Sequence, residues 1–341
     1  MNTLNKTKII VPAGHTESVA RAIFALNEGS FTKIICGAAN TNEKHVERLA
    51  LVYALSGVNV IDVAPSKKII QAAKTGIKKA SDFYNENPEA FSLFKEPVLM
   101  VSLDSGDDLH FRKAEINYEK CTSCFKCIIS CPAKAIFTEN NLLKLNKNNC
   151  FGCGRCSKAC PKDAISFTKF NNFPDFNFEE IKAIEIHTGN NSIEEVKNFL
   201  ELNVSLLKNI ELLSFCVESK RFNSVELQNY VSSLTSLVNQ KIIIQIDGIP
   251  MGATDKACSS LQAVSAAATL LESKINAYIQ LSGGSNHLTK SLVNQLGLKI
   301  SGIGYGTFSR NLILSYLEEQ EEDFYRQLQR IVNITTKLVA D

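Results

Sequence analysis

The stretch that decides the fold of this chain is CTSCFKCIISCP at residues 121–132, which returns as CFGCGRCSKACP at residues 150–161. Each copy has the spacing C-x2-C-x2-C-x3-C-P, and the two copies are 29 residues apart throughout. The likeness continues past the cysteines, because Ala135-Ile136 after the first copy is answered by Ala164-Ile165 after the second. The segment is therefore an internal repeat of one short structural unit.

This doubled spacing is typical of a bacterial-type ferredoxin that binds two 4Fe-4S clusters. Three thiolates on a tight loop hold three corners of one cluster, whereas the fourth cysteine of each run lies too far round the loop and reaches the other cluster. We therefore expect two crossed ligand sets. They are Cys121, Cys124, Cys127 and Cys160 for the first cluster, and Cys131, Cys150, Cys153 and Cys156 for the second.

Zinc and disulfides explain these cysteines less well. A structural zinc ion needs four ligands in paired C-x2-C spacing, which leaves the third cysteine and the Cys-Pro of each copy unexplained. Nothing at the N-terminus resembles a signal peptide, and a chain of 341 residues needs no covalent staples, so a disulfide scaffold is not expected. The C-x3-C-x2-C triplet of radical S-adenosylmethionine enzymes does not occur in the sequence.

The composition is that of an ordinary globular protein, with 45% hydrophobic and 21% charged residues. The 37 basic and 35 acidic residues nearly balance, so the chain has no electrostatic basis for binding nucleic acid or an anionic membrane. No apolar run approaches the ~20 residues of a membrane span. Clusters and three further thiols survive best under reducing conditions, which predicts a cytoplasmic protein.

Outside residues 115–170, short apolar runs alternate with amphipathic stretches, which is the pattern of a parallel α/β sheet. Eight such runs fit a (β/α)8 barrel, the TIM-like fold. An open doubly wound sheet with the same helices is the alternative, because periodicity does not show closure. The runs are residues 33–36, 58–63, 98–103, 183–186, 212–217, 242–246, 278–281 and 299–303.

The sequence also predicts several helix N-termini between these runs. Asn42 or Thr41 is a suitable N-cap for the first helix, and two later helices have capping-box spacing. An extra helix from about residue 16 to residue 26 precedes the first strand, and we expect it to close the bottom of the barrel. The capping boxes are Ser192 with Glu195 and Asn223 with Glu226.

The third unit departs from the pattern, because the helix expected after residues 98–103 is missing and the cysteine repeat takes its place. The predicted domains are a first part of the barrel at residues 1–114, a ferredoxin-like α+β domain at residues 115–170, and the remainder of the barrel at residues 171–341. An insertion at this point leaves from the C-terminal face of the barrel, where active sites of this fold lie. We therefore expect the clusters to border the barrel mouth.

Most of the eight runs end on a polar or reactive residue, and in a closed barrel these residues converge on one rim. Solvent exposure alone also gives polar strand ends, so each is only a candidate, and no catalytic residue is assigned. The candidates are Cys36, Asp62, Asp104, His187, Glu218, Asp247, residues 282–287 and Tyr305.

Glycines after the last two strands suggest an anion site. Gly283, Gly284 and Ser285 follow the seventh strand, and Gly304 and Gly306 follow the eighth, where barrels commonly bind phosphate through backbone N–H groups. The phosphate of flavin mononucleotide (FMN) would suit such a cradle, and a flavin beside clusters is sensible redox chemistry. The alternative is that these glycines only turn the chain.

Two further segments and three cysteines complete the candidates. His110-Phe-Arg-Lys113 places two cations near a cluster, where they would tune its potential or simply form a solvated linker. Residues 247–252, DGIPMG, form a rigid polar loop after the sixth strand. Cys36, Cys216 and Cys258 are expected to pack as small apolar side chains, with Cys36 as the candidate for a reactive thiol.

Together these segments resemble the light-dependent period (LdpA) family of cyanobacteria. The resemblance runs from near residue 31 to near residue 312, and its specificity comes from the barrel segments, because many ferredoxins share the cysteine motif. The matching stretches are residues 33–39, KIICGAA; 54–64, ALSGVNVIDVA; 110–113; the doubled cysteine motif; 247–252; 280–287, QLSGGSNH; and 304–310, GYGTFSR.

The resemblance implies an iron–sulfur protein that conveys cellular redox state, and hence light intensity, to the period of the circadian clock. It implies clock input proteins or other redox-signalling proteins as partners, together with an electron donor or acceptor, or a quinone. We favour such a redox-sensing regulator over a catalyst. The alternative is a barrel oxidoreductase, with or without flavin, in which the ferredoxin insert delivers electrons to a substrate in the barrel mouth.

Overall fold

The computed structural model describes residues 15–106, 108–169, 180–249 and 258–340. Its eight parallel strands close into a barrel, so the barrel prediction is confirmed and the open sheet is excluded. Around the barrel the strands follow the order β1 (Phe31–Ile35), β12 (Gly302–Tyr305), β11 (Tyr278–Ser282), β10 (Ile243–Asp247), β9 (Leu212–Glu218), β8 (Ala183–His187), β3 (Val98–Asp104) and β2 (Val60–Val63).

Every predicted run overlaps a barrel strand. β1 begins two residues before its predicted run, at Phe31, and the last strand is displaced the most. β12 begins at Gly302 rather than at residue 299, because its pairing with β1 starts where Phe31 lies opposite Gly302. A Cβ atom at Gly302 would lie 2.3 Å from the carbonyl oxygen of Phe31, so glycine is needed for this close approach.

Helices cover the outside of the barrel, and their apolar faces pack on the outward side chains of the strands. The Asn42 side chain caps α2 by accepting a hydrogen bond from His45 N, and both predicted capping boxes are present. The helices are α2 (Glu43–Leu55), α3 (Lys67–Glu86), α6 (Ile193–Leu202), α7 (Val204–Leu207), α8 (Ser224–Leu237), α9 (Leu261–Glu272), α10 (Thr289–Gln295), α11 (Thr307–Leu312), α12 (Leu314–Leu317), α13 (Glu321–Arg326) and α14 (Leu328–Ala340).

A further helix, α1 (Glu17–Glu28), closes the N-terminal end of the barrel, as predicted. Its buried Val19, Ala22 and Leu26 share one apolar cluster with residues at the starts of the strands, among them Phe31 and Tyr278. The bottom of the barrel is therefore sealed by apolar packing, which leaves the C-terminal mouth as its open end.

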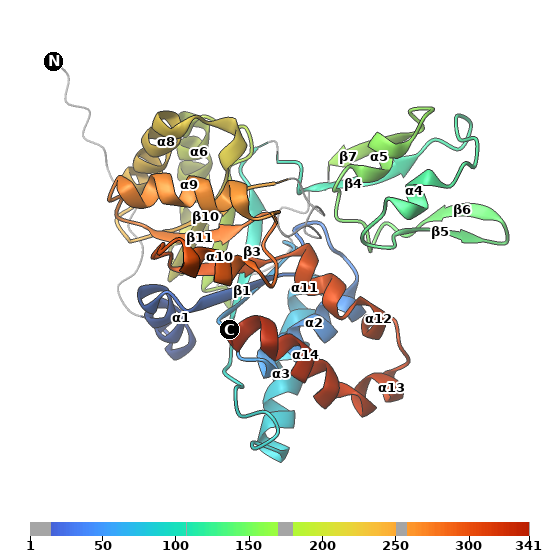
Figure 1. The fold of residues 1–341 in the computed structure, drawn as a ribbon, viewed down its shortest axis with the longest axis horizontal. Coiled ribbons are helices and arrows are strands. Elements are labelled where there is room, and N and C mark those ends of the chain that lie inside the picture. The colour runs from blue at the N-terminus through green and yellow to red at the C-terminus, as the bar shows by residue number, and fades with distance from the viewer. Residues whose placement is uncertain (1–14, 107, 170–179, 250–257, 341) are drawn as a thin grey trace.

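The insert leaves after β3 as a small domain with two antiparallel sheets. β4 (Arg112–Ile116) pairs with β7 (Ile165–Lys169), and β5 (Ile136–Glu139) pairs with β6 (Leu142–Leu145). Two short helices, α4 (Lys126–Ile129) and α5 (Arg155–Ala159), begin within the two cysteine runs and pack on each other. In Figure 1 this domain projects to the right of the barrel on the stalk formed by β4 and β7.

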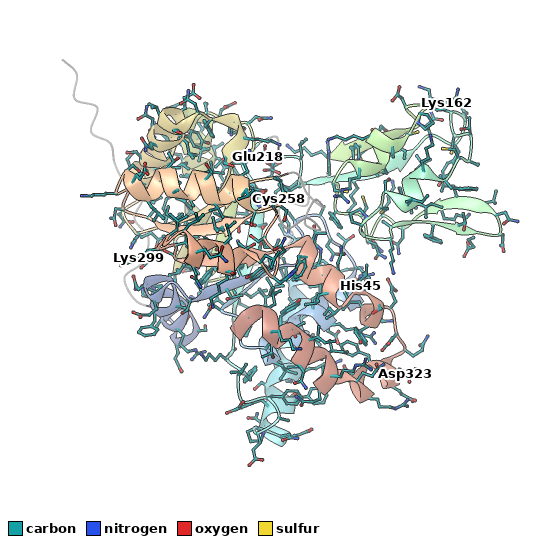
Figure 2. The ribbon with its side chains drawn as sticks, viewed as in Figure 1. His45, Lys162, Glu218, Cys258, Lys299 and Asp323 are labelled. Atoms are coloured by element: carbon teal, nitrogen blue, oxygen red, sulfur yellow. The ribbon has the colours of Figure 1, made fainter. Side chains whose placement is uncertain are left out.

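The two regions have separate cores, as the side chains in Figure 2 illustrate. Lys162 lies at the outer edge of the insert, whereas His45, Glu218, Lys299 and Asp323 lie on the barrel. The insert core consists of its cysteines and a few apolar side chains such as Ile136, none of which belongs to the barrel cores. Among the described residues, no helix is both long and apolar enough to cross a membrane.

The insert is nevertheless fixed to the barrel beside the start of α2. The backbone N–H of Thr41 donates to the carbonyl of Asn148 at 3.1 Å, and Asn42 Nδ2 donates to Asn149 Oδ1 at 2.6 Å. Lys113 Nζ also donates to Thr41 Oγ1 at 2.7 Å. These contacts hold the loop before Cys150 against the mouth end of the barrel.

Candidate functional site

The two cysteine loops share one backbone conformation. Ser123 and Phe125 of the first copy have φ of 52° and 60°, and Gly152 and Gly154, 29 positions later, have φ of 71° and 80°. Left-handed residues between right-handed ones turn successive N–H groups inward and form the concave nest that binds anionic clusters. Ser123 and Phe125 adopt this conformation at a cost of about 1–2 kcal/mol each, because they carry a Cβ atom. The loops therefore have the shape that a cluster requires.

The predicted second ligand set is gathered around one cavity. Cys131 of the first copy lines a space of about 320 Å³ together with Cys150, Cys153 and Cys156 of the second copy. Burial, and then the closeness of the other three sulfurs, raises the pKa of the Cys156 thiol to about 12. Such crowded thiols keep their protons unless a metal replaces them, so this arrangement fits an iron cluster.

For the first predicted ligand set, the contacts bring together only three of the four cysteines. Burial raises the pKa of Cys127, and the nearby Cys121 and Cys124 add to the shift, so these three are close neighbours. Cys160 packs with Cys121 against the same core. The assignment of Cys160 to this set remains a prediction from the repeat.

Backbone N–H groups donate to three of the sulfurs. Ala135 N lies 3.3 Å from Cys131 Sγ, and Ala164 N lies 3.3 Å from Cys160 Sγ, so the two Cys-Pro turns are equivalent. Ala114 N donates to Cys150 Sγ at 3.4 Å. Hydrogen bonds to cluster sulfurs are one of the means by which a protein sets the reduction potential of the cluster.

The spacing of the sulfurs argues against a single zinc ion. Four thiolates at about 2.3 Å from one zinc lie roughly 3.8 Å from one another. In the part of the chain that the structure describes, the groups of three ligand atoms within 4.8 Å of one another contain none of the eight motif cysteines. The cysteines are therefore too far apart for one ion and leave room for a larger group.

A second cavity lies at the barrel mouth, against the insert. It encloses about 660 Å³, open solvent at its entrance included. Phe151, which follows the cluster ligand Cys150, lines both this cavity and the cavity of the second cysteine set. The lining from the barrel includes His110, His187, Asp247, residues 282–285 and Arg310.

Arg310 connects the barrel to the second cysteine set. Its guanidinium carbon lies 4.6 Å from the centre of the Phe151 ring, and its Nη1 donates to the carbonyl of Ile35 at 2.6 Å. Burial lowers the pKa of Arg310 to about 10, and the nearby thiols of Cys36 and Cys153 oppose this shift, so the side chain is charged at neutral pH. Among the described residues, no carboxylate forms an ion pair with it. A loaded second cluster would provide the missing negative charge.

Below the mouth, the barrel interior holds a buried ion pair. Lys33 Nζ on β1 lies 2.5 Å from Glu185 Oε2 on β8, and both side chains are fully buried. Asp62 on β2 lies 4.0 Å from the same ammonium group. Polar neighbours complete the network: Ser102 donates to Asp62, and Ser214 and Gln245 donate to Glu185.

The two interior carboxyl groups have opposite pKa shifts. Burial raises the pKa of Asp62 to about 7, only partly offset by Lys33. Burial acts in the same sense on Glu185, but the directly bonded Lys33 and the nearby His187 outweigh it and lower the pKa to about 2. Glu185 is therefore the charged partner of Lys33, and Asp62 titrates near neutral pH.

A chain of histidines and carboxylates leads from this pair to the mouth. His187 Nε2 lies 3.3 Å from Glu185 Oε1, and His187 Nδ1 lies 3.4 Å from Asp108 Oδ2. Asp108 Oδ1 lies 2.6 Å from His110 Nδ1, and His110 Nε2 lies 3.3 Å from Asp247 Oδ2. Burial opposes the charge on His110, but Asp108 and Asp247 raise its pKa to about 10.

Only some of the predicted rim residues line the barrel mouth. His187, Asp247 and residues 282–285 line the mouth cavity, whereas Asp62 lies deeper in the barrel. Glu218 lines a small neighbouring pocket, and Asp104 holds the end of the insert by an ion pair with Lys169 at 3.0 Å. Cys36 is buried near Arg310, and Tyr305 belongs to the apolar core beneath the helices.

The glycine cradle is only partly assembled. Gly283, Gly284, Ser285 and Gly306 line the mouth cavity, but Gly304 faces the interior, where a Cβ atom would lie 2.7 Å from Gln280 Nε2. The Asp247 carboxylate occupies the space beside Gly283, and a second negative charge there disfavours a phosphate. The structure therefore gives the predicted FMN phosphate site no support.

Other sequence predictions fall outside these sites. Cys36 and Cys216 are buried as expected, and burial raises both thiol pKa values to about 12, which argues against a reactive Cys36. Cys258 is exposed, so the prediction that it packs in the core is wrong. Arg112 is a structural cation within the insert, because it stacks on Phe167 and donates to the carbonyl of Gly152. Residues 250–252 and the connection at residues 171–178 lie outside the described residues.

Sequence reasoning missed Lys33, Glu185 and Asp108. The first two are single charged residues inside otherwise apolar parallel strands, a pattern that signals an inward position in a barrel. Asp108 carries no such signal, because it lies in the irregular segment between β3 and β4.

Together, the closed (β/α)8 barrel and the twin cysteine loops define an iron–sulfur protein with a dicluster insert. Comparison with protein families agrees, because residues 114–167 match the 4Fe-4S dicluster domain. Residues 176–340 match the C-terminal domain of light dependent period A. These matches support an iron–sulfur protein of the LdpA family.

One relative matches along most of its length. The chain is 29% identical over 312 residues to light dependent period A of Synechococcus elongatus, covering 87% of this chain and 85% of that protein. Among solved structures, it is similar to the tryptophan synthase α-subunit of Pyrococcus furiosus, at 10% identity and a TM-score of 0.40 over 89% of this chain and 96% of the other. The carboxyl transferase domain of Rhizobium etli pyruvate carboxylase gives 10% identity and a TM-score of 0.44 over 99% of this chain and 54% of the other.

Proposed function

We propose that this protein is a redox-sensing regulator that conveys cellular redox state, and with it light intensity, to circadian clock input proteins. The family and the cysteine loops support the iron–sulfur part of this proposal. The observation that carries the sensing part is the position of Phe151, which lies between the second cysteine set and the barrel mouth.

The proposed signal is a change of charge beside the barrel. When bound, a 4Fe-4S cluster stores one electron and so gains one negative charge on reduction. Arg310 is a buried barrel cation close enough to Cys153 to interact with it electrostatically, and it also bonds to the end of β1 through the Ile35 carbonyl. A stronger pull on Arg310 in the reduced state would therefore be transmitted to β1 and to the loop before α2.

The insert offers partners a surface of its own. Four of its large apolar side chains are exposed around the cysteine loops, and Ile129, which is 90% exposed, lies between Cys127 and Cys131. Exposed apolar residues gathered on one small domain mark an interaction site. The others are Phe125, Phe137 and Leu142.

A sensor must bind its partner with different affinity in its two redox states. The test is capture of partners from lysate by the anaerobic protein, reduced in one arm and oxidised in the other, with Cys150→Ser as a protein that lacks the second cluster. We expect a partner whose recovery differs between the two states of the wild type and is constant for the variant. Equal recovery in both states of the wild type would contradict the proposal.

The mouth cavity favours a second candidate, a barrel oxidoreductase that receives electrons through the insert. Asp247 Oδ1 and Ser285 Oγ are buried beside this cavity and have no hydrogen-bond partner among the described residues, as expected for groups that bind a polar substrate. The visible spectrum of the anaerobic protein separates the candidates. Structured flavin bands, with fluorescence released on denaturation, would favour the enzyme, whereas broad brown absorption alone favours the regulator.

A further inference from the structure

Two histidines and one aspartate converge beside the neck of the insert. Asp108 and His110 belong to the segment that joins β3 to β4, and His187 ends β8. The carboxylate of Asp108 lies between the two rings, 2.6 Å from His110 Nδ1 and 3.4 Å from His187 Nδ1. One ligand atom from each of the three residues lies within 4.8 Å of the other two.

The Nε2 atom of each ring lies near a further carboxylate. His110 Nε2 lies 3.3 Å from Asp247 Oδ2, and His187 Nε2 lies 3.3 Å from Glu185 Oε1. A metal-bound histidine almost always donates its second N–H to a carboxylate or a carbonyl, which fixes the ring and its tautomer. Both histidines therefore direct Nδ1 toward Asp108. His110 Nδ1 is hydrogen-bonded to Asp108 Oδ1, so a metal ion would take the place of the proton between them, whereas His187 Nδ1 has no such bond.

His187 provides an independent observation. Its side chain is 5% exposed, and its Nδ1 has no hydrogen-bond partner among the described residues. The 3.4 Å that separates this atom from Asp108 Oδ2 is longer than an N–H···O hydrogen bond. A buried polar atom without a partner costs about 1–3 kcal/mol, so its position indicates a missing ligand.

The local charge favours a cation. Asp108, Asp247 and Glu185 bring three carboxylates to the two rings, and Lys33 is bonded to the far oxygen of Glu185. Asp108 and Asp247 keep His110 protonated in the metal-free chain, so a divalent ion would displace the ring proton on binding and balance the two remaining carboxylates in its place.

We propose that Asp108, His110 and His187 bind a divalent first-row transition-metal ion at the floor of the barrel-mouth cavity, separate from the cysteine clusters. Two histidines and one carboxylate are the ligand set of non-haem iron(II) and of many zinc sites with open positions. His110 and His187 line the mouth cavity, so water or a small ligand would reach the remaining positions from there. The ion would also tie the neck of the insert to β8. This proposal is independent of the regulator proposed above.

The test uses the anaerobic holoprotein with its clusters in place and zinc ions alone as the probe. Zinc binding is measured by calorimetry, and zinc and iron are both counted after desalting. We expect one zinc per chain with unchanged iron, and loss of that zinc in the double variant H110Q/H187Q. The matched control is H45Q, because His45 is also buried and lies 2.8 Å from the Glu318 carboxylate, and it belongs to none of the groups of ligand atoms that lie within 4.8 Å of one another among the described residues. H45Q should bind zinc as the wild type does.

A less disruptive substitution keeps the test valid if the double variant does not fold. Asp247→Asn removes only the carboxylate behind His110, and we expect it to weaken zinc binding by about 10–100-fold while iron content stays at the wild-type level. Three results would overturn the proposal. The first is a wild type that retains no zinc. The second is zinc uptake accompanied by an equal loss of iron, because the zinc would then be bound by the cysteines. The third is zinc affinity at the wild-type level in both D247N and H110Q/H187Q.

Discussion

The insert and the barrel build their polar sites in opposite ways. The insert takes its ligands from two loops of 12 residues whose conformation repeats, so each loop carries three predicted ligands of one cluster and the fourth ligand of the other. The barrel assembles its network from strands far apart in the chain, and Lys33 and Glu185 meet only because the barrel closes. The insert site should therefore fail locally when one ligand is removed, whereas loss of one member of the barrel network should affect the whole fold.

The largest expected effect is on the iron content of the insert. Cys150→Ser and Cys131→Ser should each abolish the second cluster, because both sulfurs line the same cavity although they come from different copies. Iron and sulfide analysis with electron paramagnetic resonance (EPR) should show the same lost signal in both variants and about half the iron. Cys258→Ser, at an exposed cysteine outside the motif, is the control. If C131S instead lost the signal that C121S loses, the crossed assignment would be wrong.

In the barrel, Lys33→Met should lower the free energy of unfolding by about 3–5 kcal/mol, because it leaves the Glu185 carboxylate buried without its cation. Denaturant unfolding of the anaerobic protein measures this loss. The control is Lys197→Ala on α6, whose ion pairs with Glu194 and Glu201 are exposed and should be worth less than about 1 kcal/mol. A loss as small as that of K197A would mean that Glu185 is held by its other partners.

A smaller effect is expected at the surface of the insert. Ile129→Ser should weaken partner binding about tenfold, or about 1.4 kcal/mol, if the exposed apolar residues form the contact. Leu202→Ser on α6 is the matched control, because Leu202 is 85% exposed but belongs to the barrel. Titration of each variant with a captured partner gives both affinities. Equal weakening by the two variants would show that the insert is not the specific surface.

The last expected effect concerns the pH dependence of the barrel. The pKa of Asp62 is raised from 3.8 to about 7 in the folded chain, so between about pH 4 and pH 7 the folded state holds a proton that the unfolded state has released. Its contribution to stability therefore falls as pH rises through this window and is constant above it. Asp62→Asn should flatten this part of the profile of thermal unfolding midpoint against pH. An unchanged slope would show that Asp62 is ionised in the fold.

The same contrast explains what the sequence predicted. The cysteine loops were predictable because their ligands lie a few residues apart, and the strands because β-branched runs alternate with capped helices such as α8. Asp108 and Glu185 escaped prediction because their partners depend on barrel register and on the path of an irregular neck. The predicted phosphate site at the glycines lacks support for the same reason, since Gly304 faces inward toward Gln280.

The central claim is that the second cluster lies against the barrel mouth, with the buried cation of Arg310 beside it. The most direct test is a potentiometric EPR titration of the wild type and of Arg310→Met under anaerobic conditions. Removal of this positive charge should make the reduction potential of the second cluster more negative, because the reduced cluster carries more negative charge, and should leave the first cluster nearly unchanged. Two clusters with wild-type potentials in R310M would contradict the claim.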